Sequence, residues 1–135
     1  MAVYLSNGVQ VSVAGKDLSA YVSSVTLNRT VDSLEVTAMG DAGHKYVAGL
    51  ESSSVTIDFF NDWATDKVGQ TLDTAFGTTV AVVVQPAAGA ASATNPKYTF
   101  NVLVDSITPV NGAVGDLATQ SVTWQVNGAI VKTTS

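Results

Sequence analysis

The fold is decided by the stretch VSSVTLNRTVDSLEVTAMGDAGHKYVAGLESSSVTIDFF, which runs from Val22 to Phe60. Its two outer parts alternate apolar with polar residues, and a period of two is typical of a β-strand with one buried face. The segment between them, Asp32 to Gly49, is far longer than the roughly 2 to 5 residues of an ordinary hairpin loop. We therefore predict two paired strands joined by a long arm. The core-facing phase holds Val25, Leu27 and Arg29 in the first strand and Val55, Ile57 and Phe59 in the second.

Further strands are predicted on both sides of this stretch. Alternation, or a short apolar run bounded by turn residues, marks each of them. The dipeptide Asn127-Gly128 is typical of a tight turn and predicts a break before a last short strand. The predicted strands span Val3 to Leu5, Val9 to Val13, Thr79 to Gln85, Tyr98 to Val104, Ala118 to Val126 and Ala129 to Lys132.

One helix is predicted, from about residue 62 to 76. Asn61 or Asp62 can cap its N-terminus, and Gly77 can end it. Gly69 in its middle costs roughly 1 kcal/mol relative to Ala, so the helix depends on packing against a sheet. Apolar residues recur every four positions and predict a core-facing stripe, which consists of Ala64, Val68, Leu72 and Phe76.

The whole chain, residues 1 to 135, is expected to form one domain with a core of its own. About seven or eight strands and one helix predict a mainly β fold. We expect two packed antiparallel sheets, as a sandwich or an open barrel, with one flanking α-helix. The arm, residues 32–49, is expected to project as a long β-hairpin.

The composition indicates a chain that contacts other protein. Charged residues make up only 13% of it, against about 25% in ordinary soluble domains, and Ser, Thr, Ala and Gly stand in their place. The net charge of −5 disfavours nucleic-acid binding through a basic patch. The chain has no cysteine, and its most apolar run is too short to span a membrane. No secretory signal is expected, because the first residues lack a basic region followed by an apolar one.

Residues that could carry catalysis or bind a metal are scarce. His44 is the only histidine, and neither a Gly-x-Ser-x-Gly motif nor a cysteine supplies a nucleophile for it. The acidic residues are scattered singly, without the spacing of a calcium loop or the His and Cys pairs of a zinc site. Gly40 and Gly43 lack the Lys-Ser/Thr of a phosphate loop and are interpreted as bends of the arm. We predict no enzyme activity and no catalytic, cofactor-binding or metal-binding residue.

The second faces of the long strands are small and polar, and they carry neither Lys nor Glu. An ordinary solvated sheet face is the simpler interpretation, but such faces usually carry both. DNA bears about one negative charge per 1.7 Å of duplex and adheres to Lys and Arg, so a smooth, slightly acidic wall would suit a passage for DNA. The residues predicted to face such a lumen are Ser24, Thr26, Asn28, Ser54, Thr56, Asp58, Thr99, Asn101, Asp105, Thr119, Ser121, Thr123 and Gln125.

The sequence resembles the tail tube (major tail) proteins of long-tailed bacteriophages. That family combines a D-L-S-x-Y start, an alternating strand, an arm with V-T-x-x-G-D, an aromatic residue and an A-G-L exit. The matching pieces here are Asp17 to Tyr21, Val36-Thr37, Gly40-Asp41, Tyr46 and Ala48 to Leu50. The later part, NPKYTFNVLV and GAVGDLATQSVTWQVNG, fits more loosely.

The resemblance implies hexameric rings that stack into a helical tube, in which the long strands of neighbouring subunits form one barrel. It implies that the tail terminator, the tail tip and the tape-measure protein are partners, and that double-stranded DNA passes through the lumen without specific binding. The protein would be made in the bacterial host cytoplasm and reside in the virion tail. The arm would bridge consecutive rings through Leu34, Val36, Met39, Asp41, His44, Lys45, Tyr46 and Val47.

Two other functions stay open at the level of sequence. A capsid decoration protein is also a small, β-rich phage protein, and it would bind capsids as compact trimers without forming tubes. A carbohydrate-binding or adhesion sandwich would give clear hits on a glycan array, although the lack of an expected export signal disfavours it.

Overall fold

The structure is a computed structural model that describes residues 8–87 and 89–134. The strand predicted at Val3 to Leu5 therefore lies outside the described residues. The elements are β1 (Gln10–Val13), β2 (Lys16–Asp17), a 3-10 turn (Ser19–Tyr21), β3 (Val22–Asn28), β4 (Val31–Glu35), β5 (Tyr46–Glu51), β6 (Ser54–Phe60), α1 (Val68–Ala75), β7 (Thr79–Gln85), β8 (Lys97–Leu103) and β9 (Thr119–Thr133).

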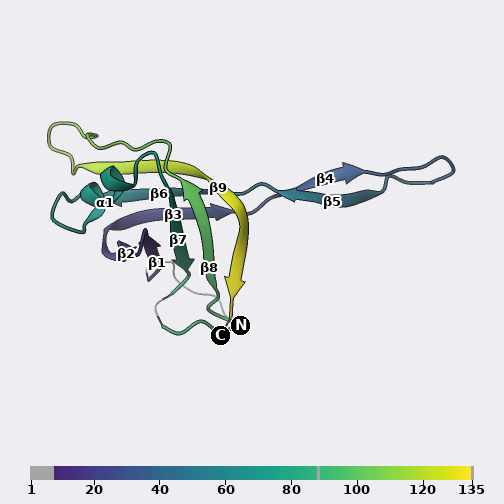
Figure 1. The fold of residues 1–135 in the computed structure, drawn as a ribbon, viewed down its shortest axis with the longest axis horizontal. Coiled ribbons are helices and arrows are strands. Elements are labelled where there is room, and N and C mark those ends of the chain that lie inside the picture. Colours follow the sequence, from purple (N-terminus) through teal and green to yellow (C-terminus); the bar gives the residue numbers. More distant parts are fainter. Residues whose placement is uncertain (1–7, 88, 135) are drawn as a thin grey trace.

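The mainly β prediction is confirmed. Seven strands form one antiparallel sheet in the order β2-β1-β7-β8-β9-β6-β3, and β4 and β5 form a separate two-stranded sheet. The large sheet curls on itself as an open half-barrel, with β3, β6 and the first part of β9 in one layer and β1, β7 and β8 in the other (Figure 1). The two predicted layers are thus halves of a single sheet, because β9 belongs to both.

The core lies inside this curl. The alternation read from the sequence holds in β6 and in the first part of β9, from Thr119 to Gln125, where every second side chain is buried. α1 closes one end of the core with Val68, Leu72 and Ala75. The largest fully buried side chains are Trp124, Phe59, Leu18, Ile57 and Leu72.

The predicted turn at Asn127-Gly128 is wrong, because β9 runs unbroken through it. Before this dipeptide β9 pairs with β6, from Thr119 to Gln125, and from Val126 onward it pairs with β8. Gly128 has a φ of +97°, and the β8–β9 register shifts just beyond it. Glycine at a positive φ therefore bends one long strand from the first layer into the second.

The predicted helix is also shorter than expected: α1 covers Val68–Ala75, whereas the prediction began near residue 62. Asp62 caps a turn instead, since its carboxylate accepts a hydrogen bond from the Ala64 amide at 2.9 Å. Asp66 then adopts a φ of +62°, which interrupts helical geometry. Ala64 lies before the helix, and Phe76 leaves helical geometry at its C-cap, with φ −57° and ψ 128°. Both ends of the predicted stripe are therefore exposed.

The arm prediction is confirmed as a hairpin. β4 and β5 pair antiparallel, with Leu34 opposite Val47 and Glu35 opposite Tyr46. The hairpin projects away from the body and ends in a loop, residues 36–45 (Figure 1). Its side chains contribute nothing to the buried core, so the arm is not needed to pack the body.

Gly69 is required by packing. A Cβ atom there would lie 2.6 Å from Cδ2 of Trp63 and 3.0 Å from Oδ1 of Asn61. The indole ring thus rests directly on the helix backbone. Glycine has no Cβ atom and so leaves room for the ring, at the conformational cost of a glycine inside a helix.

We expect Gly69→Ala to leave the protein no more stable than the parent, although Ala favours helices by roughly 1 kcal/mol over Gly. The new methyl group displaces the Trp63 ring, so the tryptophan emission should shift to the red. Thermal unfolding and fluorescence check this, with Gln70→Ala, an exposed neighbour on the same helix, as the control. A stability gain of about 1 kcal/mol with unchanged emission would contradict the packing role.

Candidate assembly surfaces

The polar face of the first layer is built from three neighbouring strands in register. Asn28 of β3, Ser54 of β6 and Gln125 of β9 form one row across the sheet. The next two rows are Thr26–Thr56–Thr123 and Ser24–Asp58–Ser121, and Thr119 follows at the end of β9. Ten of the thirteen residues predicted to face a lumen thus share one surface, here called the three-strand face.

Hydrogen bonds hold the side chains of this face together. Thr56 Oγ1 lies 3.2 Å from Thr123 Oγ1, and Ser121 Oγ donates to Asp58 Oδ1 at 2.6 Å. Asp58 is the only charged residue among the ten, and none of them is basic. The face is therefore smooth and slightly acidic, and it offers no lysine or arginine to a phosphate.

The other three predicted residues lie elsewhere. Thr99 and Asn101 belong to β8, where they pair with Val131 and Asn127 at and beyond the bend of β9. Asp105 follows the end of β8 and is exposed. These three therefore lie outside the three-strand face.

All eight residues predicted for the arm occur together on the hairpin. By register, Leu34 and Val47 face the same side of it, and Val36, two residues beyond Leu34, continues this apolar stripe. Leu34, Val36 and Val47 are each about half exposed, and Met39 at the tip is fully exposed. Exposed apolar groups in such a row are typical of a contact with another protein.

Polar contacts shape the tip of the arm. His44 Nδ1 lies 2.6 Å from Glu35 Oε2, which also accepts a hydrogen bond from Thr37 Oγ1 at 2.8 Å. These two contacts lower the pKa of the Glu35 carboxyl group. Asp41 accepts the Ala38 amide at 2.7 Å and pairs with Lys45 at 2.9 Å, and both contacts lower its pKa. His44 thus contacts the Glu35 carboxyl group within the tip.

The base of the arm is attached to the body by a cluster that sequence reasoning missed. Glu51, the last residue of β5, accepts a hydrogen bond from Arg29 at 3.0 Å and another from the amide of Ile130 at 3.0 Å. Arg29 in turn lies over the Tyr98 ring, 6.0 Å from its centroid. We call these residues the arm latch: Arg29, Glu51, Tyr98 and the Ile130 amide. The sequence did contain one indication of the arm latch. Arg29 occupies a core-facing position of its strand, where a charged side chain needs a partner.

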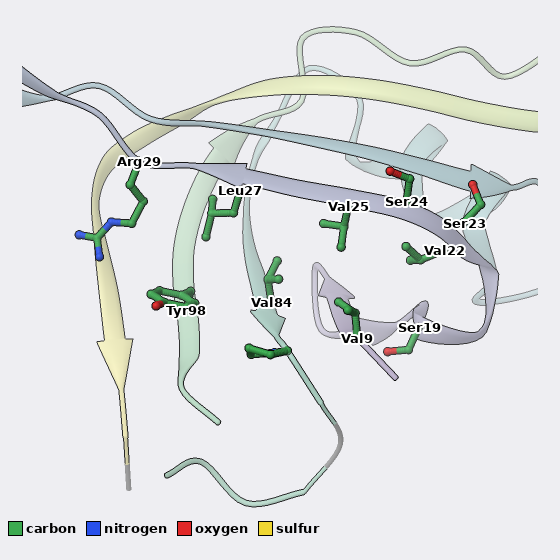
Figure 2. A pocket seen from close by; sticks show the side chains of 11 residues that line it. Val9, Ser19, Val22, Ser23, Ser24, Val25, Leu27, Arg29, Val84 and Tyr98 are labelled. Atoms are coloured by element: carbon green, nitrogen blue, oxygen red, sulfur yellow. The ribbon is translucent and has the colours of Figure 1, made fainter. Parts of the chain in front are cut away.

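A hollow of about 670 Å³ opens along the free side of β3. Figure 2 shows Val25 and Leu27 of β3 facing it from above, with Val84, Tyr98 and Val9 on its other wall. β3 is the last strand of the sheet, so among residues 8–87 and 89–134 its outer backbone edge has no partner strand. This seam of the half-barrel joins the open strand edge to a mixed lining, in which valines, Leu27 and Tyr98 alternate with serines and Arg29. An open strand edge is a surface that can pair with another strand.

The structure offers little to other classes of site. Among the described residues, no group of three or more His, Cys, Asp or Glu side chains is placed to hold a metal ion. No helix in the described part of the chain is long and apolar enough to cross a membrane.

The fold is shared with solved structures of phage-like particles. No family model matches the sequence, and no curated protein matches it. A chain of a native gene transfer agent virion superposes with a TM-score of 0.76 at 16% identity, over 97% of this chain and 99% of that one. A chain from the tail of an empty gene transfer agent particle, determined with C6 symmetry, gives 0.66 at 16% identity, over 93% of each chain. The likeness extends over nearly the whole of both molecules, and at this identity it establishes a common fold.

We expect the arm latch to release at low pH. Contacts with Arg29 and the Ile130 amide lower the pKa of Glu51 beneath its ordinary 4.5, so they stabilise the latch above that pH and are lost as the pH falls through the lowered value. Hydrogen exchange at the Ile130 amide, normalised to intrinsic rates, should show protection at pH 7 that declines below about pH 4.5. Glu51→Ala should lack this protection at both pH values, while Glu35→Ala in the arm tip should retain it. Equal protection in Glu51→Ala and the parent would refute the latch.

Proposed function

We propose that this chain is a structural virion protein of a phage-type tail, without catalytic activity, that stacks as hexameric rings into the tail tube. The observation that carries the proposal is the three-strand face, a broad sheet surface that holds one acid and no base. The shared fold with virion and tail chains supports the same conclusion. The protein would be made in the host cytoplasm and act in the virion.

In this arrangement the three-strand face lines the lumen. Double-stranded DNA would pass along hydroxyl and amide groups that make no ion pairs with phosphates, and the carboxylate of Asp58 would repel them. DNA would therefore move through the tube without being held. The slightly acidic wall performs no chemistry on the DNA and reads no sequence.

Rings would form through the free edge of β3. An unpaired strand edge beside a partly apolar seam favours pairing with a neighbouring copy, and a closed ring removes every such edge. The C6 symmetry of the tail that shares this fold supports six copies per ring. The tail terminator, tail tip and tape-measure protein would bind the tube at its ends and inside it.

Stacking would depend on the arm. A projecting hairpin that meets a different surface on the next copy makes a head-to-tail contact, and such contacts generate filaments when they do not close. The apolar stripe of the arm, from Leu34 to Met39, supplies the exposed groups for this contact.

We expect the purified chain to form hollow tubes that negative-stain microscopy shows directly. Replacing Thr37 to His44 by a short Asn-Gly turn should leave the body folded, as judged by circular dichroism, and should abolish the tubes. The substitution Lys132→Ala, at an exposed position of β9 outside the arm, serves as the control and should still form tubes. Normal tubes from the shortened arm would refute its role in stacking, and compact trimers that bind only capsids would refute the tail tube itself.

We expect Thr56→Lys with Thr123→Lys to permit assembly but to make the tubes retain DNA. Six subunits per ring would place many new cations along the path of the duplex, and retention should weaken steeply as salt is raised. Co-sedimentation of DNA with the tubes measures this. Thr74→Lys with Gln70→Lys, on exposed positions of α1, adds the same charge and is the matched control. Equal retention by both variants would show that the three-strand face does not line the lumen.

A further inference from the structure

A cluster of exposed apolar side chains lies at the end of the body opposite the arm. It belongs to the loop between β8 and β9, residues 104–118, which Figure 1 places far from the hairpin along the long axis. Val110 and Val114 are almost completely exposed, and Leu117 is 71% exposed. Free monomers rarely leave three such groups on one loop in water, so this surface is suited to a partner.

The loop is held in place, so this surface is preformed. Thr108 Oγ1 accepts a hydrogen bond from the Ser121 amide at 2.9 Å, and the Asn111 carbonyl accepts one from the Thr119 amide at 3.1 Å. Trp124 Nε1 donates to the Ser106 carbonyl at 2.9 Å. These bonds fix the loop along the edge of β9 and leave its apolar side chains outside.

A shallow hollow of about 320 Å³ lies beside these side chains, between Trp63 and the loop segment 109–113. Trp63 is half exposed, and its ring is supported from behind by Gly69. Asp116 lines the hollow, Asp62 precedes Trp63, and the lining contains no basic residue. An exposed aromatic ring in a hollow with a negative rim is a suitable receptor for an apolar group flanked by cations.

The arm tip has the complementary character. Met39 is fully exposed and follows the apolar stripe. In the two polar pairs of the tip the nitrogen-bearing side chains are the more exposed members: Lys45 is 64% exposed against 17% for Asp41, and His44 is 72% exposed against 49% for Glu35. The tip thus presents an apolar side chain beside outward-facing nitrogen atoms.

We infer that the arm tip of one copy docks on the hollow formed by Trp63 and the 104–118 loop of a copy in the next ring. This rests on the proposed function and names the receptor that the stacking arm would meet. Because arm and hollow occupy opposite ends of one chain, each copy both gives and receives a contact. The contact is repeated from ring to ring without closing.

Disulfide trapping tests the contact cleanly, because the chain has no cysteine of its own. Met39→Cys is mixed with Val110→Cys, Val114→Cys or Leu117→Cys, allowed to assemble and oxidised. At least one mixture should give a cross-linked heterodimer on a non-reducing gel. Val131→Cys, an exposed valine on the distant part of β9, is the matched control and should give none. No cross-link with any loop position, or an equal yield with the control, would overturn the inference.

Polar substitutions then separate this inference from the proposed function. Val114→Ser with Leu117→Ser should raise the critical concentration for tube formation by about tenfold, while Val131→Ser should leave it unchanged. Tubes from the parent chain with unchanged assembly of the loop variant would overturn the docking site and leave the tail tube standing. No tubes from the parent chain under any condition, with the cross-link still formed, would overturn the tube and preserve the contact.

Discussion

The structure depends on one long strand that serves two layers. β9 completes the first layer by pairing with β6 and the second by pairing with β8, and the positive φ of Gly128 allows it to bend between them. The curl that encloses the core follows from this bend. Two residues later, the Ile130 amide donates a hydrogen bond to the Glu51 carboxylate at the base of the arm. The direction of the arm is therefore tied to the same bend that closes the body.

Much of this fold could be predicted from the sequence, because alternation is a local record of which side chains are buried. It identified β3, β6 and β9 and the uniform character of their outer face. Two local signals gave wrong results. Asn127-Gly128 has the composition of a hairpin turn, but whether glycine turns a chain back or only bends it depends on the partner strands, which are distant in sequence. The helix was predicted too long because the left-handed conformation of Asp66 leaves no periodic trace in the sequence.

The candidate surfaces divide in the same way. The arm and the common surface of the ten residues in the three-strand face were predictable. In paired strands, residues that point to the same side of the sheet lie next to each other, so the polar residues of the three strands form one surface. Thr99 and Asn101 share that phase but follow the bend of β9 into the other layer, which alternation alone does not reveal. The arm latch and the Trp63 hollow each join segments far apart in the chain. Their only sequence signals were a cation in a core-facing phase and a glycine inside a helix.

The continuity between arm and body has a mechanical consequence. β4 continues from β3, and β5 leads directly into β6, so a pull on the arm is directed along the axes of two sheet strands. β6 is bonded to β9 along its whole length. If the arm bridges stacked rings as proposed, tension between rings would load that row of hydrogen bonds together, in shear, and would not peel them apart one at a time. In a tail built from such subunits, the hydrogen bonds of the sheets would resist stretching, while the loops at the two ends of each subunit would form the contacts between subunits.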